Sequence, residues 1–247
     1  MPEPLSWIEP DWPAPPHIRT IVTTRQGGVS LPPFDGLNLA DHVGDDPKAV
    51  IQNRKLLCES LGLPAEPLWL TQVHGCNVLE AEACPAGGEA DAVIAHTQGQ
   101  VCAVLTADCL PLLLCDREGA QVAAIHAGWR GLAAGVIEAA LKRFSAPGEE
   151  IVAWLGPAIG PQAFEVGDEV RDAFIKHDPS AANAFVVNRP GHWLADIYLL
   201  ARQRLVACGV GFVGGGDCCT VFDEARFFSY RRDGKTGRMA SLIWMEK

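Results

Sequence analysis

The chain has 247 residues, and its 20 Lys and Arg stand against 30 Asp and Glu, for a formal net charge of −10. This negative balance provides no overall basic field for a polyphosphate backbone or an anionic membrane surface. We therefore expect a small-molecule ligand, with neither nucleic acid nor a membrane as partner.

Composition also predicts the compartment and the domain count. No segment reaches the roughly 18 apolar residues of a membrane helix, and the proline-rich start lacks the charged and apolar regions of a secretory signal. The nine cysteines include no C-x-x-C pair, which is typical of scattered thiols in a reducing compartment. We predict a cytoplasmic protein with one domain over residues 1–247, in which residues 1–17 form a proline-rich N-terminal arm.

A strand and a helix are expected after the arm. Ile18 to Arg25 is a β-rich run that ends at a glycine turn. Asp45-Asp46-Pro47 offers the capping residues of a helix start, and apolar residues then recur at helical spacing until Gly62.

The middle of the chain alternates short apolar runs with turns, as strands covered on both faces do. The runs are Leu68–Val73, Val78–Ala81, Ala92–Ala95, Val101–Thr106, Leu110–Cys115 and Gln121–His126. A tight turn at Gly128 and a helix from about Leu132 to Phe144 follow, and this strand-turn-helix order predicts an α/β fold.

The C-terminal third is expected to hold more of both element types. It contains a strand at Ile151–Leu155, helices at about Asp168–His177 and Leu194–Cys208, and strands at Phe227–Arg231 and Met239–Trp244. The polar stretch Asp233–Gly237 between the last two strands predicts a hairpin turn.

The candidate functional residues lie where apolar runs end. His74, Cys109 and His126 each follow such a run and sit beside glycine or proline. Side chains at strand ends are held by the sheet yet face the crevice above it, so two imidazoles and a thiolate there can share one metal ion. Three protein ligands leave the fourth position of a zinc ion for water, which is the arrangement of a hydrolytic zinc with a water pKa of roughly 7.

The spacing of these residues leaves a second interpretation open. The separations between His74, Cys109 and His126 match no zinc-finger or zincin pattern. A core thiol and two structural histidines therefore remain an alternative to a metal site.

Several motifs resemble the YfiH, or laccase-domain, family over nearly the whole chain. The specific ones are Gln72-Val73-His74-Gly75, Ala107-Asp108-Cys109-Leu110-Pro111 and His126-Ala127-Gly128-Trp129-Arg130-Gly131. Others are Thr23–Ser30, Leu37–Leu39, His42–Gly44, Gly156–Gly160, Glu165–Gly167 and Phe228–Arg232.

The resemblance implies a fold and an activity. The fold would be a single-domain layered α/β sandwich of mixed sheets flanked by helices, with zinc bound by His74, Cys109 and His126. The activity would be phosphorolysis of adenosine, inosine, guanosine and S-methyl-5'-thioadenosine, together with deamination of adenosine. Purine nucleosides and phosphate would be its small-molecule partners, and we expect a monomer.

Four further residues are candidates for supporting roles. Asp108 is expected to orient His126 or to move a proton. Arg25 and Arg130 are candidates to hold phosphate or a ribosyl oxyanion, although an arginine that closes a loop is an equal alternative. Asn38 is a candidate to hydrogen-bond ribose or base.

Members of the family have also been described as copper polyphenol oxidases and as cysteine hydrolases. The seven histidines form no H-x-H pair of the multicopper type, but a lone copper could occupy the same ligands. In a hydrolase, Cys109 would be the nucleophile, His126 or His74 its base, and Asp108 the orienting group. A binding module with a structural metal would need a fourth ligand, for which Cys76 is the candidate.

Overall fold

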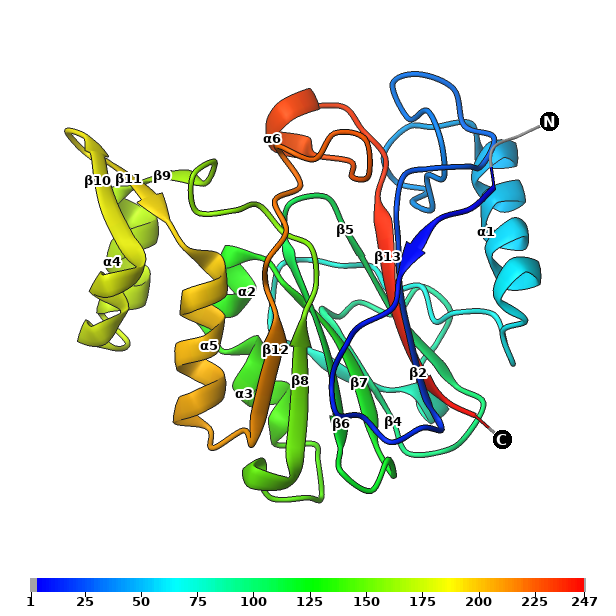
Figure 1. The fold of residues 1–247 in the computed structure, drawn as a ribbon, viewed down its shortest axis with the longest axis horizontal. Coiled ribbons are helices and arrows are strands. Elements are labelled where there is room, and N and C mark those ends of the chain that lie inside the picture. Colours follow the sequence, from blue (N-terminus) through cyan, green and yellow to red (C-terminus); the bar gives the residue numbers. More distant parts are fainter. Residues whose placement is uncertain (1–3, 247) are drawn as a thin grey trace.

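The structure is a computed structural model that describes residues 4–246, and its strands form three sheets (Figure 1). The strands are β1 Trp7–Ile8, β2 Ile18–Thr23, β3 Val78–Glu80, β4 Ala92–Ala95, β5 Val101–Thr106, β6 Leu110–Asp116, β7 Val122–Ala127, β8 Ile151–Leu155, β9 Glu165–Gly167, β10 Phe185–Arg189, β11 His192–Ala195, β12 Phe212–Gly215 and β13 Met239–Met245. The helices are α1 Pro47–Leu61, α2 Trp129–Ala134, α3 Val136–Leu141, α4 Asp168–Ile175, α5 Ile197–Ala207 and α6 Tyr230–Asp233.

The largest sheet has six strands in the order β12-β8-β6-β7-β4-β3, and its four central strands are buried on both faces. Successive residues of a strand point to opposite faces, and β6 follows this rule. Leu110, Leu112 and Leu114 pack with helices α2, α3 and α5, whereas Leu113 and Cys115 pack against the second sheet. Figure 1 shows these helices on one side of the sheet.

The second sheet has four strands in the order β1-β2-β13-β5, all antiparallel. One of its faces packs on the six-stranded sheet, and its other face is covered by Leu37, Leu39 and Leu57 of the N-terminal loop and α1. The layers are therefore helices α2, α3 and α5, then the six-stranded sheet, then the four-stranded sheet, and last α1 with the N-terminal loop. This arrangement confirms the predicted α/β sandwich of mixed sheets flanked by helices.

A small third sheet, β10-β11-β9, extends beside α4 at the edge of the molecule (Figure 1). Its strand β9 follows directly on Phe164, a residue that lines the pocket described below.

The N-terminal arm is integrated into the second sheet. Within its described part, Trp7 and Ile8 pair with β2, and the carbonyl oxygen of Ser6 accepts hydrogen bonds from the backbone N and Oγ1 of Thr24. Residues 1–3 of the predicted arm lie outside the described residues.

Several predicted elements have the expected bounds, and others differ for local reasons. The strands predicted at Ala92–Ala95, Val101–Thr106 and Ile151–Leu155 are confirmed. The helix predicted over Leu132–Phe144 is two helices, α2 and α3, because Gly135 between them adopts a left-handed φ of 99°. The helix predicted from Leu194 begins at Ile197, because Leu194 belongs to β11 and Asp196 caps the helix.

Two predicted strands are wrong. The segment Leu68–Val73 forms isolated bridges and no strand ladder. Instead, the side-chain amide of Gln72 binds the backbone of Leu105: its Nε2 donates to the carbonyl oxygen, and its Oε1 accepts from the backbone N. At the C-terminus no hairpin forms, because Phe227 and Phe228 are buried in a loop and the Ser229 hydroxyl accepts a hydrogen bond from Arg232 N to begin α6. The following strand β13 pairs with β2 and β5 instead.

None of the helices in residues 4–246 has the length and apolar character needed to cross a membrane.

Candidate metal centre

The register of two antiparallel strands brings Cys109 and His126 together. Leu110 pairs with Ala127 and Pro111 pairs with His126 between β6 and β7. Cys109 precedes β6 and Gly128 follows β7, so both lie at the same edge of the sheet. His126 continues the row of β7 side chains that faces the second sheet, and only 3% of its surface is exposed.

His74 reaches this edge from the loop before β3. It adopts a left-handed φ of 61°, which non-glycine residues rarely hold without support. The support comes from the buried carboxylate of Asp91, which accepts hydrogen bonds from the backbone N of His74 at 2.9 Å and of Gly75 at 2.6 Å. The same carboxylate lies 2.7 Å from Nδ1 of His126.

The three side chains fit a metal ion. One nitrogen each of His74 and His126 and the Cys109 sulfur all lie within 4.8 Å of one another, and His74 Nε2 is 3.9 Å from Cys109 Sγ. Since Asp91 occupies Nδ1 of His126, Nε2 is the nitrogen left to bind a metal, which is the way carboxylates orient histidine ligands. Residues 4–246 contain no second group of three His, Cys, Asp or Glu side chains with this geometry.

Cys76 does not supply a fourth ligand. Its thiol is exposed and lines a different surface hollow, beside Asn77 and Glu89. The binding-module alternative therefore loses the ligand on which it depended.

Gly128 leaves room for the three candidate ligands. A Cβ built there would lie 3.0 Å from His74 Cδ2, 3.1 Å from Cys109 Sγ and 3.4 Å from His126 Cε1. Its φ of −59° is open to any residue, so the close contacts rather than the backbone favour glycine. The turn between β7 and α2 thus helps the three side chains to converge.

Charge couples Cys109 to the histidines in the metal-free chain. Burial alone would raise the pKa of the Cys109 thiol, but His126 and His74 lower that pKa to about 6. Burial would likewise lower the pKa of His126, whereas the Cys109 thiolate and the Asp91 carboxylate raise it to about 9. A thiolate beside an imidazolium results, and a divalent cation would replace the imidazolium proton.

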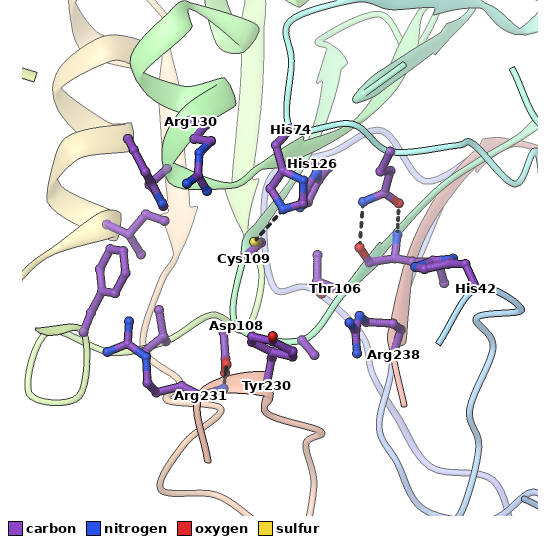
Figure 2. Close-up of a pocket in the computed structure, with 17 residues that line it drawn as sticks. His42, His74, Thr106, Asp108, Cys109, His126, Arg130, Tyr230, Arg231 and Arg238 are labelled. Atoms are coloured by element: carbon purple, nitrogen blue, oxygen red, sulfur yellow. Dashed lines mark hydrogen bonds between the residues drawn. The ribbon is translucent and has the colours of Figure 1, made fainter. Parts of the chain in front are cut away.

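These residues form part of a pocket of about 370 Å³ (Figure 2). One part of the pocket is lined by the apolar side chains of Trp129, Ile159, Phe164 and Ile197. The guanidinium of Arg130 lies 4.4 Å over the ring of Trp129. Figure 2 shows His74, Cys109 and His126 between Arg130 on one side and Arg238 and His42 on the other.

Of the two roles predicted for Asp108, the orientation of His126 is wrong, and the movement of a proton stays a prediction. Asp91, and not Asp108, orients His126. Asp108 has a left-handed φ of 88°, and its two carboxylate oxygens accept hydrogen bonds from Thr220 Oγ1 and Arg231 N, both at 2.6 Å. It lines the pocket and ties the turn before Cys109 to the C-terminal segment.

Two predicted substrate-binding residues lie outside this pocket. The Arg25 guanidinium pairs with Asp35 at 3.0 Å and lies over Phe228, so it closes a loop. Asn38 is fully buried and bonded to Asp45, Ala40 and Arg238 N, which leaves its amide no access to a ligand. Arg130 does line the pocket.

Asp91 was not found from the sequence. Asp91 stands at the start of an apolar run rather than at its end. Because β4 is antiparallel to β7, that start lies at the same edge as the end of β7. The signal that could have found Asp91 was a carboxylate at the start of a strand, β4, that is antiparallel to β7.

Known proteins match this chain over nearly its whole length. The model of the family described as multi-copper polyphenol oxidoreductase laccase matches residues 19–246. The chain belongs to this laccase-domain, or YfiH, family.

The relatives agree with the fold and carry an enzyme name. The purine nucleoside phosphorylase of Pseudomonas aeruginosa is 56% identical over 242 residues, which cover 98% of this chain and 99% of the relative. The purine nucleoside phosphorylase YfiH of Escherichia coli is 55% identical over 239 residues, or 96% and 98% of the two chains. A crystal structure of a Neisseria meningitidis protein has a TM-score of 0.94 and 51% identity, with 98% and 99% of the two chains covered.

Proposed function

We propose that this chain is a zinc-dependent purine nucleoside enzyme. It would cleave adenosine, inosine, guanosine and S-methyl-5'-thioadenosine with phosphate, and it would also deaminate adenosine. The observation that carries the proposal is the convergence of His74, Cys109 and His126 in one pocket beside an apolar wall. The relatives named purine nucleoside phosphorylase support the same class of reaction.

His74, Cys109 and His126 would hold the zinc. A bound zinc would supply a Lewis acid and a water of lowered pKa. The chain's own residues prepare that site: Asp91 fixes the ring of His126 and the loop of His74, and Gly128 keeps space beside the sulfur.

The apolar wall suits the base of a nucleoside. Trp129 and Phe164 offer aromatic surface, and Arg130 stacks over Trp129 with no described hydrogen bond or ion pair of its own. Its guanidinium is therefore available to substrate atoms. In phosphorolysis a phosphate oxygen bonds to C1′ as the bond from C1′ to the purine nitrogen breaks, and the leaving purine takes a proton.

Deamination of adenosine needs a different placement of the same substrate. A water-derived oxygen must bond to C6 as ammonia leaves, so C6 rather than C1′ would face the metal centre. One pocket can serve both reactions only if it accepts nucleosides in two poses.

A copper oxidase is less well supported. Residues 4–246 contain one three-residue group able to hold a metal, whereas a multicopper oxidase needs a mononuclear and a trinuclear site. Copper binds nitrogen and sulfur ligands more tightly than zinc does. Any oxidase activity in vitro would then follow the metal that is supplied.

A cysteine hydrolase has one observation in its favour. Asp91, His126 and Cys109 are arranged as orienter, base and nucleophile. A nucleophile needs only one imidazole, however, and here His74 approaches the same sulfur. Two histidines converging on one thiolate fit a metal better.

We also propose that the protein works in the cytoplasm. All nine cysteines are free in the described chain, as expected of a reducing compartment.

Product analysis tests the reaction. Adenosine with phosphate should yield adenine and ribose 1-phosphate, and inosine should yield hypoxanthine, as separated by chromatography. Omission of phosphate should stop both, whereas inosine formation from adenosine should continue without it. Turnover of a phenol with copper, in the absence of any nucleoside conversion, would favour the oxidase instead.

A further inference from the structure

Arg238 is a partly buried cation in the pocket wall that has no acidic partner among the described residues. It stands just before β13 and lines the pocket on the side opposite Arg130 (Figure 2). It forms no ion pair with any carboxylate of residues 4–246, and its side-chain hydrogen bonds run only to the carbonyl oxygens of Thr236 and Gly237. In a chain of net charge −10, a half-buried arginine without a carboxylate is unexpected.

The surroundings hold this arginine in place. Its Nη1 donates to the carbonyl oxygens of Thr236 at 2.8 Å and Gly237 at 2.9 Å. Its backbone N donates to Oδ1 of the buried Asn38 at 3.0 Å. A Cβ on Gly237 would lie 2.7 Å from Phe228, so this turn can pack only with glycine. Asn38 thus acts as a positioning residue for Arg238.

The rest of the guanidinium is free for a ligand. Nε and Nη2 have no described hydrogen-bond partner, and the guanidinium lies 5.9 Å over the ring of Tyr230. Figure 2 shows the group pointing into the pocket. Burial lowers the pKa of Arg238, while Cys109 and Asp108 oppose that effect, and an arginine remains charged throughout. Both carboxylate oxygens of Asp108 are already engaged by Thr220 and Arg231. An incoming anion would supply the missing charge.

The two ends of the pocket differ in exposure and polarity, and these differences indicate which part of the substrates each end would bind. Arg130 is exposed to solvent and lies on the apolar, aromatic side, where water already hydrates its charge. Arg238 is less exposed, and its neighbour Met239 pairs with the polar residue Thr106, which also lines the pocket. An anion therefore gains more from Arg238, and the planar guanidinium matches two oxygens of a phosphate.

We propose that Arg238 binds the phosphate co-substrate, with the nucleoside base on the opposite, Arg130 side of the metal centre. This assignment rests on the proposed phosphorolysis. It makes Arg238 the residue that determines the affinity for phosphate, while the apolar wall determines that for the nucleoside.

The test compares Arg238→Met, Arg238→Lys and Arg130→Met with wild type, all zinc-loaded. Loss of a charge-assisted contact should raise the KM for phosphate roughly tenfold to a hundredfold in Arg238→Met, with little change in the KM for inosine. Arg238→Lys keeps the charge without the two-pronged geometry and should be intermediate. Arg130→Met should change the KM for inosine more than that for phosphate.

Controls separate binding from folding. Arg117→Met removes an exposed arginine that pairs with Glu150 away from the pocket, and it should leave both KM values unchanged. Circular dichroism and zinc content should match wild type in each variant. An unchanged KM for phosphate in Arg238→Met or Arg238→Lys, or an equal rise in both KM values, would overturn the proposal.

A second measurement does not depend on turnover. Inorganic phosphate should raise the Tm of the wild-type protein and of Arg117→Met, but not that of Arg238→Met. If no nucleoside is converted yet this pattern is found, the proposed function fails and the anion site stands. The anion site is wrong if phosphate does not shift the Tm of the wild-type protein. It is also wrong if phosphate shifts the Tm of Arg238→Met and Arg238→Lys as much as that of wild type.

Discussion

The carboxylate of Asp91 lies 2.7 Å from Nδ1 of His126 and thereby fixes which nitrogen of that ring faces Cys109. The same carboxylate accepts hydrogen bonds from the backbone N of Val73, His74 and Gly75. One buried side chain therefore holds both histidines of the candidate metal centre. Burial would raise its pKa, but the hydrogen bonds from His126, Gly75 N and His74 N and the charge of His126 lower that pKa, so the carboxylate remains ionised at neutral pH.

Asp91→Asn should weaken metal binding without unfolding the protein. An amide cannot stabilise the oriented ring as a carboxylate does, and loss of such a partner costs roughly tenfold to a hundredfold in metal affinity. Competition with a chelator measures the affinity. Asp116→Asn, which alters a buried carboxylate at the far end of β6, is the matched control and should retain wild-type zinc affinity. Equal affinity in Asp91→Asn and wild type would refute this role.

Gly128→Ala should reduce zinc content. The added methyl would lie within 3.0 to 3.4 Å of atoms of all three candidate ligands, so at least one must move. Elemental analysis of the purified variant measures its zinc content. Gly62→Ala introduces the same methyl at a helix end where nothing lies within 4 Å, and should lower stability by about 1 kcal/mol through its left-handed φ while zinc content stays normal. Full zinc in Gly128→Ala would contradict the crowding argument.

Alkylation of the metal-free protein should depend on pH through Cys109. Because its pKa is lowered to about 6, the thiolate is present above that pH, and reaction with iodoacetamide should slow as the pH falls through about 6. Cys84, whose pKa is raised by burial, should react only at much higher pH. Peptide mass spectrometry distinguishes the two sites. His126→Ala should move the Cys109 profile to higher pH, and identical profiles for Cys109 and Cys84 would be inconsistent with the coupling.

Cys109→Asp should retain more zinc and more activity than Cys109→Ala. A carboxylate can bind zinc where a methyl group cannot. Metal content and phosphorolysis rate are measured on both variants. If both are inactive yet bind a full equivalent of zinc, the sulfur performs covalent chemistry and the cysteine-hydrolase interpretation gains.

The sheets could be predicted from sequence where strands are buried on both faces. Ala92–Ala95, Val101–Thr106 and Ile151–Leu155 are continuous apolar runs, and their bounds are as expected. Phe227–Arg231 misled the prediction because its aromatic residues have high β-propensity. In the fold Phe227 and Phe228 pack in an apolar cluster with Ala107 and Met239 instead of pairing with a strand.

The candidate site was predictable in part for a topological reason. His74, Cys109 and His126 follow apolar runs, so a search at the ends of runs finds them. Asp91 precedes a run and reaches the same edge only because β4 and β7 are antiparallel, a pairing that no local pattern reveals. Asn38 and Arg238 are joined across 200 positions by a single hydrogen bond, and such long-range contacts are beyond local sequence patterns.

Under the proposed function, nucleoside cleavage requires one zinc ion held by His74, Cys109 and His126. The most direct measurement is zinc content alongside adenosine phosphorolysis, before chelation, after chelation and after zinc is restored. This zinc requirement predicts about one zinc per chain, loss of both metal and activity on chelation, and recovery of both with zinc but not in His126→Ala. Full activity in a preparation free of metal would contradict it.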